Sequence, residues 1–130
     1  MEKVYDFLKK CGTYYLATID GDQARVRPFG TIDIYNGDLT IQTGKKKDVS
    51  KQIHANPKVE ICAFDGEKWL RLAATAVEVP EKEAAEHMLD SYPSLRAMYT
   101  PGDSNTEIFK LIDAAATFSS FTAAPETITW

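Results

Sequence analysis

Short turn signals recur along this chain, and they constrain its fold more than any other feature. Asp20-Gly21-Asp22, Asn36-Gly37 and Asp65-Gly66 each separate two stretches that are rich in β-branched and aromatic residues. Dipeptides of the Asn-Gly and Asp-Gly type favour the tight turns of β-hairpins, because both of their residues tolerate a positive φ angle. Strands joined by tight turns are antiparallel, so the sequence predicts an antiparallel sheet built from successive hairpins.

The stretches between these turns predict about six strands. Strand patterns cover residues 13–19, 23–35, 39–43, 58–64 and 69–79, and residues 107–121 supply one or two more. Pro28 interrupts the second pattern, and proline is tolerated in a strand only at an edge or a bulge. Three short helices are predicted over residues 2–11, around residues 49–53 and after Pro80. Six hairpin-linked strands around one small core favour closure into a barrel over an open sandwich.

Length and charge exclude several classes of protein. At 130 residues the chain has room for one core, so we expect a single domain over residues 1–130. The formal net charge of −4 argues against a basic surface for nucleic acid or anionic membranes. The longest run without a charged residue, 114–125, falls well short of the about 20 apolar residues that a transmembrane helix needs. The charged N-terminus has no signal-peptide core and Cys11 and Cys62 are isolated thiols, so we expect a reduced, cytoplasmic protein.

Positive charge is concentrated in one part of the chain. Residues 22–71 carry nine Lys or Arg and seven Asp or Glu, whereas the rest of the chain carries six and twelve. Between residues 39 and 59, Asp48 is the only acid among five lysines. A local excess of positive charge in an acidic protein favours a small anionic ligand over a polymer.

Arg25 and Arg27 begin the region in which we expect that ligand. Because side chains alternate along a strand, both arginines point to one face, about 7 Å apart, while Val26 points to the other. Planar guanidinium groups at this spacing suit the recognition of an oxyanion. Pro28 removes a hydrogen-bond donor from the strand, which leaves neighbouring backbone groups free to contact a ligand.

The returning strand delivers a second set of polar groups. Thr43-Gly44 is followed by Lys45-Lys46-Lys47 at the start of a predicted helix. A hydroxyl, a close backbone approach, helix N-terminal amides and ammonium groups together form a phosphate site. Lys47 and Lys51 are four residues apart and share one face of that helix, with Gln52 beside it. Three consecutive lysines are equally consistent with a solvated loop, and the arginine-bearing hairpin nearby favours the site.

Three stretches carry a family resemblance. RVRPFG at 25–30, LTIQTGKKKDVSKQIHANPKVEICAF at 39–64 and WLRLAATAVEV at 69–79 resemble, in their order and spacing, the small FMN-binding split-barrel proteins of the pyridoxamine 5′-phosphate oxidase-like superfamily. The resemblance covers about residues 1–80 well and the rest loosely. It implies a mainly β fold with short α-helices, a six-stranded antiparallel split β-barrel. It also implies a homodimer with two FMN molecules at the subunit interface.

The resemblance further implies roles for individual residues. The strand from Arg25 to Phe29 is expected to lie along the flavin, with backbone groups at the isoalloxazine ring and arginine side chains at the ribityl phosphate. Thr43 is expected to supply a hydroxyl, and Lys47 to pair with the phosphate. Trp69 and Arg71 share a strand face and are expected to border the same site, from the partner subunit. The predicted cofactor-binding residues are Arg25, Val26, Arg27, Pro28, Phe29, Gln42, Thr43, Lys46, Lys47, Lys51 and Gln52.

The end of the chain departs from the pattern of the true pyridoxamine phosphate oxidases. Those enzymes end in an Arg- and Trp-bearing segment that holds the substrate, whereas this chain ends FSSFTAAPETITW. Activity on pyridoxamine phosphate is therefore not expected, and the sequence does not identify the redox partner of the flavin. The sequence also leaves two interpretations of residues 98–106, a lid over the flavin and a solvent-exposed loop.

Other chemistries find little support in the sequence. His54 and His87 have no metal-ligand partner at a useful spacing, so no metal site is expected. No serine lies in a GxSxG context, and neither GxGxxG nor GxxxxGK[ST] is present, which argues against acyl transfer, a Rossmann fold and a P-loop. Cys62 has no histidine or cation that the sequence places beside it, so we interpret it as structural.

Two hypotheses for the function follow. The first is an FMN-dependent oxidoreductase in which electrons pass from NADH, NADPH or another donor to a small acceptor, with no side chain acting as acid or base. The second is a non-catalytic module on the same barrel that binds or stores FMN, haem or another anionic ring. The colour of the purified protein and its bleaching by a reduced nicotinamide separate the two.

Overall fold

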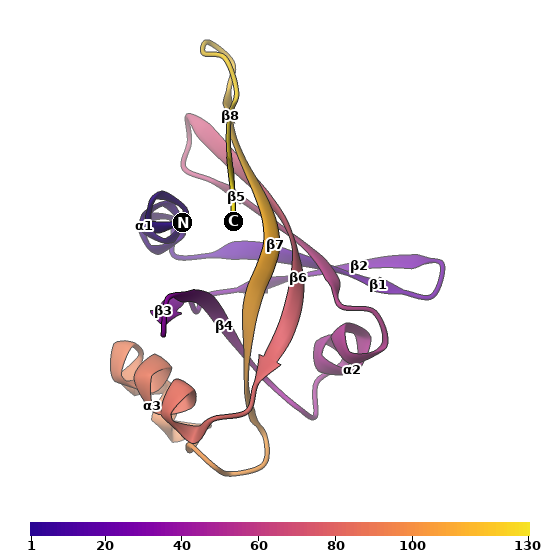
Figure 1. Cartoon of the computed structure of the whole chain (residues 1–130), viewed down its shortest axis with the longest axis vertical. Helices are drawn as coiled ribbons and strands as arrows, with labels where there is room; N and C mark the ends of the chain where they lie inside the picture. The colour runs from indigo at the N-terminus through magenta and orange to yellow at the C-terminus, as the bar shows by residue number, and fades with distance from the viewer.

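The tight turns predicted from the sequence join antiparallel strands in the computed structural model, which describes residues 1–130 (Figure 1). Three hairpins are formed: β1 (Tyr14–Asp20) with β2 (Gln23–Phe29), β3 (Asp33–Tyr35) with β4 (Asp38–Gly44), and β5 (Lys58–Phe64) with β6 (Lys68–Val79). Asn36 and Gly37 adopt φ angles of 52° and 81°, as a two-residue hairpin turn with two left-handed residues requires.

The strands form one curled sheet that does not close on itself. Its order is β2-β1-β5-β6-β7-β4-β3, with β7 spanning Thr106–Ser120, and the short β8 (Glu126–Thr129) pairs with β7 outside this path. Every pairing is antiparallel. The two end strands, β2 and β3, do not pair with each other, which is the opening of a split barrel. The predicted mainly β, antiparallel split-barrel fold is confirmed.

The strands number eight rather than six, and two short ones account for the difference. The pattern over residues 23–35 forms both β2 and β3, because the chain leaves the sheet between them and buries Ile32 in the core. The amide and carbonyl of Ile32 bond to the hydroxyl of Tyr92 instead of a neighbouring strand. β8 lies beyond residue 121, where the sequence predicts no strand.

The predicted helices are present. α1 (Glu2–Cys11) ends at Gly12, α2 (Asp48–Ala55) follows the three lysines, and α3 (Lys82–Ser91) follows Pro80. A short 3₁₀ helix, η1 (Pro93–Ala97), comes next. In Figure 1, α2 lies beside the β1–β2 hairpin, whereas α3 lies on the other side of the molecule. No helix has the length and apolar character needed to cross a lipid bilayer.

The core fills the inside of the curled sheet. It is a cluster of 21 buried residues, to which α1 contributes Val4 and Leu8. A separate small cluster joins Ala84, Ala85 and Met88 of α3 to Ile108 of β7. β4 is buried along almost its whole length, from Leu39 to Gly44.

Candidate functional site

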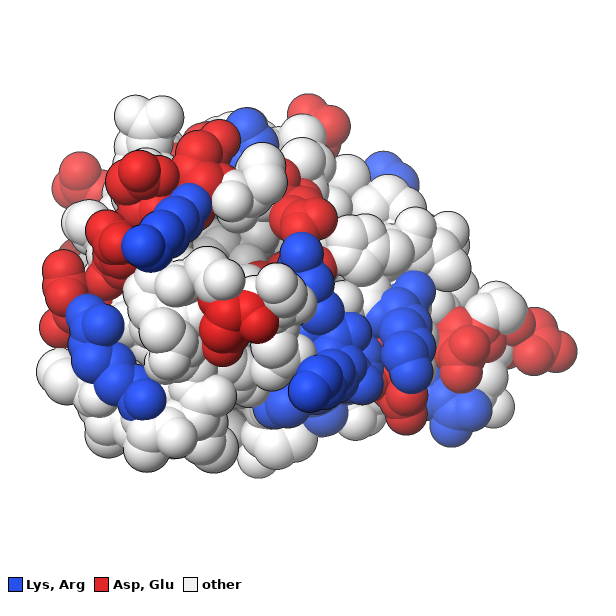
Figure 2. All heavy atoms as spheres, turned by 90° about the horizontal axis from the view of Figure 1, so that it is seen from below, with Lys and Arg blue, Asp and Glu red and all other residues white.

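A cationic hollow of about 980 Å³ lies between the β1–β2 hairpin and α2. It is lined by four Lys or Arg side chains and two acids, Asp20 and Asp48. Figure 2 shows basic side chains gathered on this side of the molecule, while acidic ones dominate the side of α3. The hollow brings together six of the predicted cofactor-binding residues: Arg25, Val26, Arg27, Lys47, Lys51 and Gln52.

Arg27 is fixed within the hollow by three hydrogen bonds. Its Nη1 donates to Thr18 Oγ1 at 2.7 Å and to the carbonyl of Leu16 at 3.3 Å, and its Nη2 donates to Gln52 Oε1 at 2.6 Å. Thr18 Oγ1 in turn donates to the same Gln52 oxygen at 2.6 Å. A guanidinium has five N–H groups, so two remain for a ligand. Burial lowers the pKa of Arg27, but an arginine at this position stays charged.

The other cations of the hollow are less constrained. Arg25 pairs with Asp20 at 3.1 Å and Lys51 approaches Asp48 at 4.0 Å, and all four of these side chains are largely exposed. Lys47 is the N-cap residue of α2, forms no ion pair, and provides no side-chain cap for the first turn of the helix. The start of a helix with uncapped amides, beside an unpaired ammonium group, favours an anion.

Five of the predicted residues lie outside the hollow. Pro28 is exposed opposite Tyr15, and Phe29 packs against Tyr14 with ring centroids 5.9 Å apart. Lys46 is exposed in the turn before α2. Gln42 and Thr43 are both buried in β4. Their roles toward a cofactor therefore stay predictions.

Gln42 stands out because both polar atoms of its side-chain amide are buried without a hydrogen-bond partner. It pairs across the sheet with Ile108, on the surface that α3 covers. We expect Gln42→Met, which preserves volume, to leave stability unchanged or raise it by about 1 kcal/mol, because an unpartnered buried amide costs desolvation free energy. Urea unfolding measures this, and a loss above about 1 kcal/mol would instead reveal a water or ligand bonded to the amide.

The 98–106 segment is fastened to the lysine turn. Asn105 accepts hydrogen bonds from the backbone N–H of Lys45 at 2.8 Å and of Lys46 at 3.2 Å. Asp103 holds the segment together by accepting backbone hydrogen bonds from Thr106 and Thr100, which hold the pKa of its carboxyl well below the usual range. These contacts make the segment a brace for the turn that leads into α2.

A surface with several large apolar side chains, and with the exposed charges of Glu60 and Arg71, adjoins the cationic hollow, and we call it the exposed sheet face. Its large side chains are Tyr15, Ile19, Val26 and Phe64, which are 52%, 40%, 67% and 57% exposed. Small residues of the same face, among them Ala17 and Ala73, line a second hollow of about 510 Å³. Ile19 lines both hollows, so the cationic hollow opens onto the exposed sheet face.

Trp69 and Arg71 lie on this same face, as their spacing in the sequence predicts. In the register of the sheet, Trp69 is opposite Phe64 and Arg71 is opposite Cys62. Cys62 is exposed and unpaired. Trp69 also packs against Phe121, with ring centroids 5.1 Å apart.

Two functional contacts were missed by the sequence analysis. The first is the hydrogen bond of Arg27 to Thr18, a residue that the sequence did not mark as part of the site. Counting back across the Asp20-Gly21-Asp22 turn does pair Thr18 with Arg25, on the same strand face as Arg27. The second contact lies behind α2, where Glu107 of β7 accepts a hydrogen bond from Ser50 at 2.6 Å and lies 2.7 Å from His54 Nε2. No local signal links these residues, because more than fifty positions separate them in the chain.

Comparison with known proteins gives one family and one fold. The family model for pyridoxamine 5′-phosphate oxidase matches residues 1–120. A solved NimC/NimA family protein from Clostridium acetobutylicum is 37% identical, with a TM-score of 0.96 over 100% of this chain and 92% of that one. No curated protein matches the sequence.

Two more distant structures share the fold alone. General stress protein 26 from Bacillus anthracis is 17% identical, with a TM-score of 0.78 over 99% of this chain and 97% of that one. A haem-binding protein from Mycobacterium smegmatis is 13% identical, with a TM-score of 0.76 over 98% of this chain and 57% of that one.

Proposed function

The chain belongs to the pyridoxamine 5′-phosphate oxidase family, and on that premise we propose that it is an FMN-dependent redox protein. The observation that carries the proposal is the fixed guanidinium of Arg27 in the cationic hollow, with two N–H groups left for an anion. A phosphate ester of a planar ring fits a cationic hollow that opens onto an apolar surface. Activity on pyridoxamine phosphate itself is not part of the proposal.

The chain's own groups divide the work of binding between them. Arg27, held by Thr18 and Gln52, offers a donor whose orientation is set before the ligand arrives, which reduces the entropy lost on binding. Lys47, which forms no ion pair, and the amides at the start of α2 add positive charge, partly offset by Asp48 in the first turn of the helix. The exposed sheet face supplies apolar surface for the ring.

FMN, when bound, supplies the hydride or electron chemistry, and the protein supplies binding, orientation and electrostatics. No histidine, cysteine, or pair of carboxylates lines the cationic hollow, apart from the exposed Asp20 and Asp48. The residues there accordingly bind and orient. NADH or NADPH is the proposed electron donor, and a small molecule is the proposed acceptor.

A visible spectrum of the purified full-length chain tests the proposal. We expect a yellow protein whose flavin absorbance bleaches when NADH or NADPH is added without oxygen, and whose released chromophore is FMN. A flavin that binds but is not reduced would favour the storage module. A colourless protein that takes up no added FMN would overturn the flavin assignment, and uptake of haem instead would support the second hypothesis, for which the Mycobacterium smegmatis fold relative is the reason.

We also propose that the exposed sheet face is covered by a second copy of the chain, with FMN at the interface. Four large apolar side chains and a hollow lined by small residues lie together there, and an exposed apolar patch of this kind marks an interaction surface. The small side chain of Ala73 is exposed on this face, so a bulky charge is tolerated by the single subunit.

Ala73→Arg is therefore expected to dissociate the homodimer while leaving the subunit folded. A long charged side chain on each copy would be desolvated or would separate the two surfaces. Sedimentation equilibrium measures the change, with the α3 surface variant Glu83→Arg as the control. A dimer that survives Ala73→Arg, or a wild-type chain that is monomeric, would contradict this assignment.

A further inference from the structure

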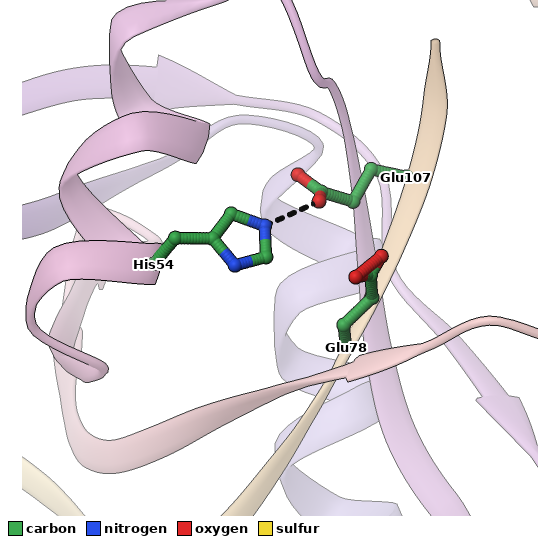
Figure 3. A group of neighbouring side chains, drawn as sticks. All are labelled: His54, Glu78 and Glu107. Carbon is green, nitrogen blue, oxygen red and sulfur yellow. Dashed lines mark hydrogen bonds and ion pairs between the residues drawn. The ribbon is translucent and has the colours of Figure 1, made fainter. Parts of the chain in front are cut away.

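We propose that His54, Glu78 and Glu107 form a site for one divalent transition-metal ion, such as Zn²⁺, on the side of α2 away from the cationic hollow (Figure 3). One ligand atom from each residue lies within 4.8 Å of the others. The three side chains come from three elements, α2, β6 and β7, and point toward one another. The sequence offered no such site, because only the fold brings the two carboxylates to His54.

The buried charge of Glu107 is the first reason for the proposal. Its side chain is fully buried, and no lysine or arginine pairs with it. One carboxylate oxygen accepts a hydrogen bond from Ser50, and the other lies 2.7 Å from His54 Nε2. A buried carboxylate is costly unless a cation compensates it, and a divalent ion between Glu107 and His54 supplies that charge.

Access from solvent is the second reason. Glu78 and Glu107 line one small cavity of about 220 Å³ beside α3. The side chain of His54 is 50% exposed and that of Glu78 is 31% exposed, so an ion can enter and water can complete its coordination. Lys45 Nζ lies 3.6 Å from Glu78, and this largely exposed lysine can turn into solvent when an ion binds.

The geometry requires only small side-chain movements. Bonds of about 2.0–2.2 Å to Zn²⁺ place tetrahedral ligand atoms roughly 3.4 Å apart. The contact between His54 and Glu107 must therefore widen from 2.7 Å, and the partly exposed Glu78 must move inward. Neutral His54 coordinates through Nε2 with its hydrogen on Nδ1, while Ser50 continues to orient Glu107 from the outer shell.

The donor set indicates the class of ion. One imidazole nitrogen and two carboxylate oxygens suit Zn²⁺ and similar first-row ions, whereas Mg²⁺ prefers an all-oxygen shell with several waters. Bound there, the ion would tie α2 to β6 and β7, which restrains the helix that carries Lys51 and Gln52. The site does not depend on the flavin proposal, since none of its ligands lines the cationic hollow.

The chain contains a matched control in its other histidine. His87 on α3 contacts the buried carboxylate of Asp33, which reproduces the pairing of His54 with Glu107. No third ligand joins that pair, so it is expected to bind no ion. Exposed Cys62 is the alternative zinc ligand that must be tested separately.

The test is calorimetric titration of ZnCl₂ into the full-length chain after treatment with a chelator, together with thermal unfolding. We expect one ion per chain, a raised Tm, and at least tenfold weaker binding in Glu78→Gln and His54→Gln. His87→Gln and Cys62→Ser are expected to bind as the wild type does, and excess MgCl₂ is expected not to compete. Glu107 is buried, so Glu107→Gln can perturb folding, and the variant of the partly exposed Glu78 decides the outcome. Absence of binding, binding unchanged in Glu78→Gln, or binding lost in Cys62→Ser would overturn the proposal.

Discussion

Arg27→Ala is expected to weaken FMN binding by about 1.5–3 kcal/mol, roughly 10- to 150-fold, because the variant loses charge-assisted hydrogen bonds to the phosphate. Arg27 is the most firmly held cation of the hollow, so its contribution carries little entropic cost. Riboflavin, which has no phosphate, should bind the variant nearly as well as it binds the wild type. Fluorescence titration with both flavins measures the difference.

Lys47→Ala is expected to act in the same direction with a smaller loss, because the Lys47 side chain is exposed and flexible. Lys82→Ala removes an exposed lysine of α3, where the ammonium group lies 3.8 Å from Glu86 and outside both hollows, and serves as the matched control. Thr18 and Gln52 still bond to each other without Arg27, so the variant should remain folded. Equal losses for FMN and riboflavin would show that the phosphate does not bind at this hairpin.

The parts of this site that the sequence predicted are those governed by local rules. The alternation of a strand put Arg25 and Arg27 on one face, and the structure brings both into one hollow with Lys47 and Lys51. Lys47 is the N-cap residue of α2 and not part of the helix face that its spacing from Lys51 predicted. The same local rules predicted the hairpin turns and both ends of α1.

The parts that were not predicted depend on contacts between distant segments. β4 is buried on both faces, so the alternation of apolar and polar residues could not say which surface Gln42 or Thr43 faces. Glu107 meets His54 only because β7 runs beside β4 and beneath α2. His54 has no ligand partner at short spacing, so the sequence predicted no metal site there, whereas the fold brings the carboxylates of Glu78 and Glu107 near it.

Phe109→Ala is expected to cost the largest amount of stability of any change considered for this chain, about 3–5 kcal/mol. Phe109 is 1% exposed, lies in β7 opposite Ile41, and belongs to the main core. Its ring also contacts that of His54, with centroids 5.6 Å apart, so it supports α2 from below. Removing the ring leaves a cavity between the sheet and the helix, and close-packed surroundings fill such a cavity only in part.

Phe121→Ala is the matched control, because Phe121 is 89% exposed and its loss should change stability by no more than about 0.5 kcal/mol. For a domain of this size the difference corresponds to a fall in Tm of roughly 10–20 °C for Phe109→Ala alone. Because α2 also carries Lys51 and Gln52, the folded fraction of Phe109→Ala should bind FMN more weakly than Phe121→Ala does. Similar unfolding midpoints for the two variants would mean that the space beneath α2 collapses without cost, and would contradict the prediction.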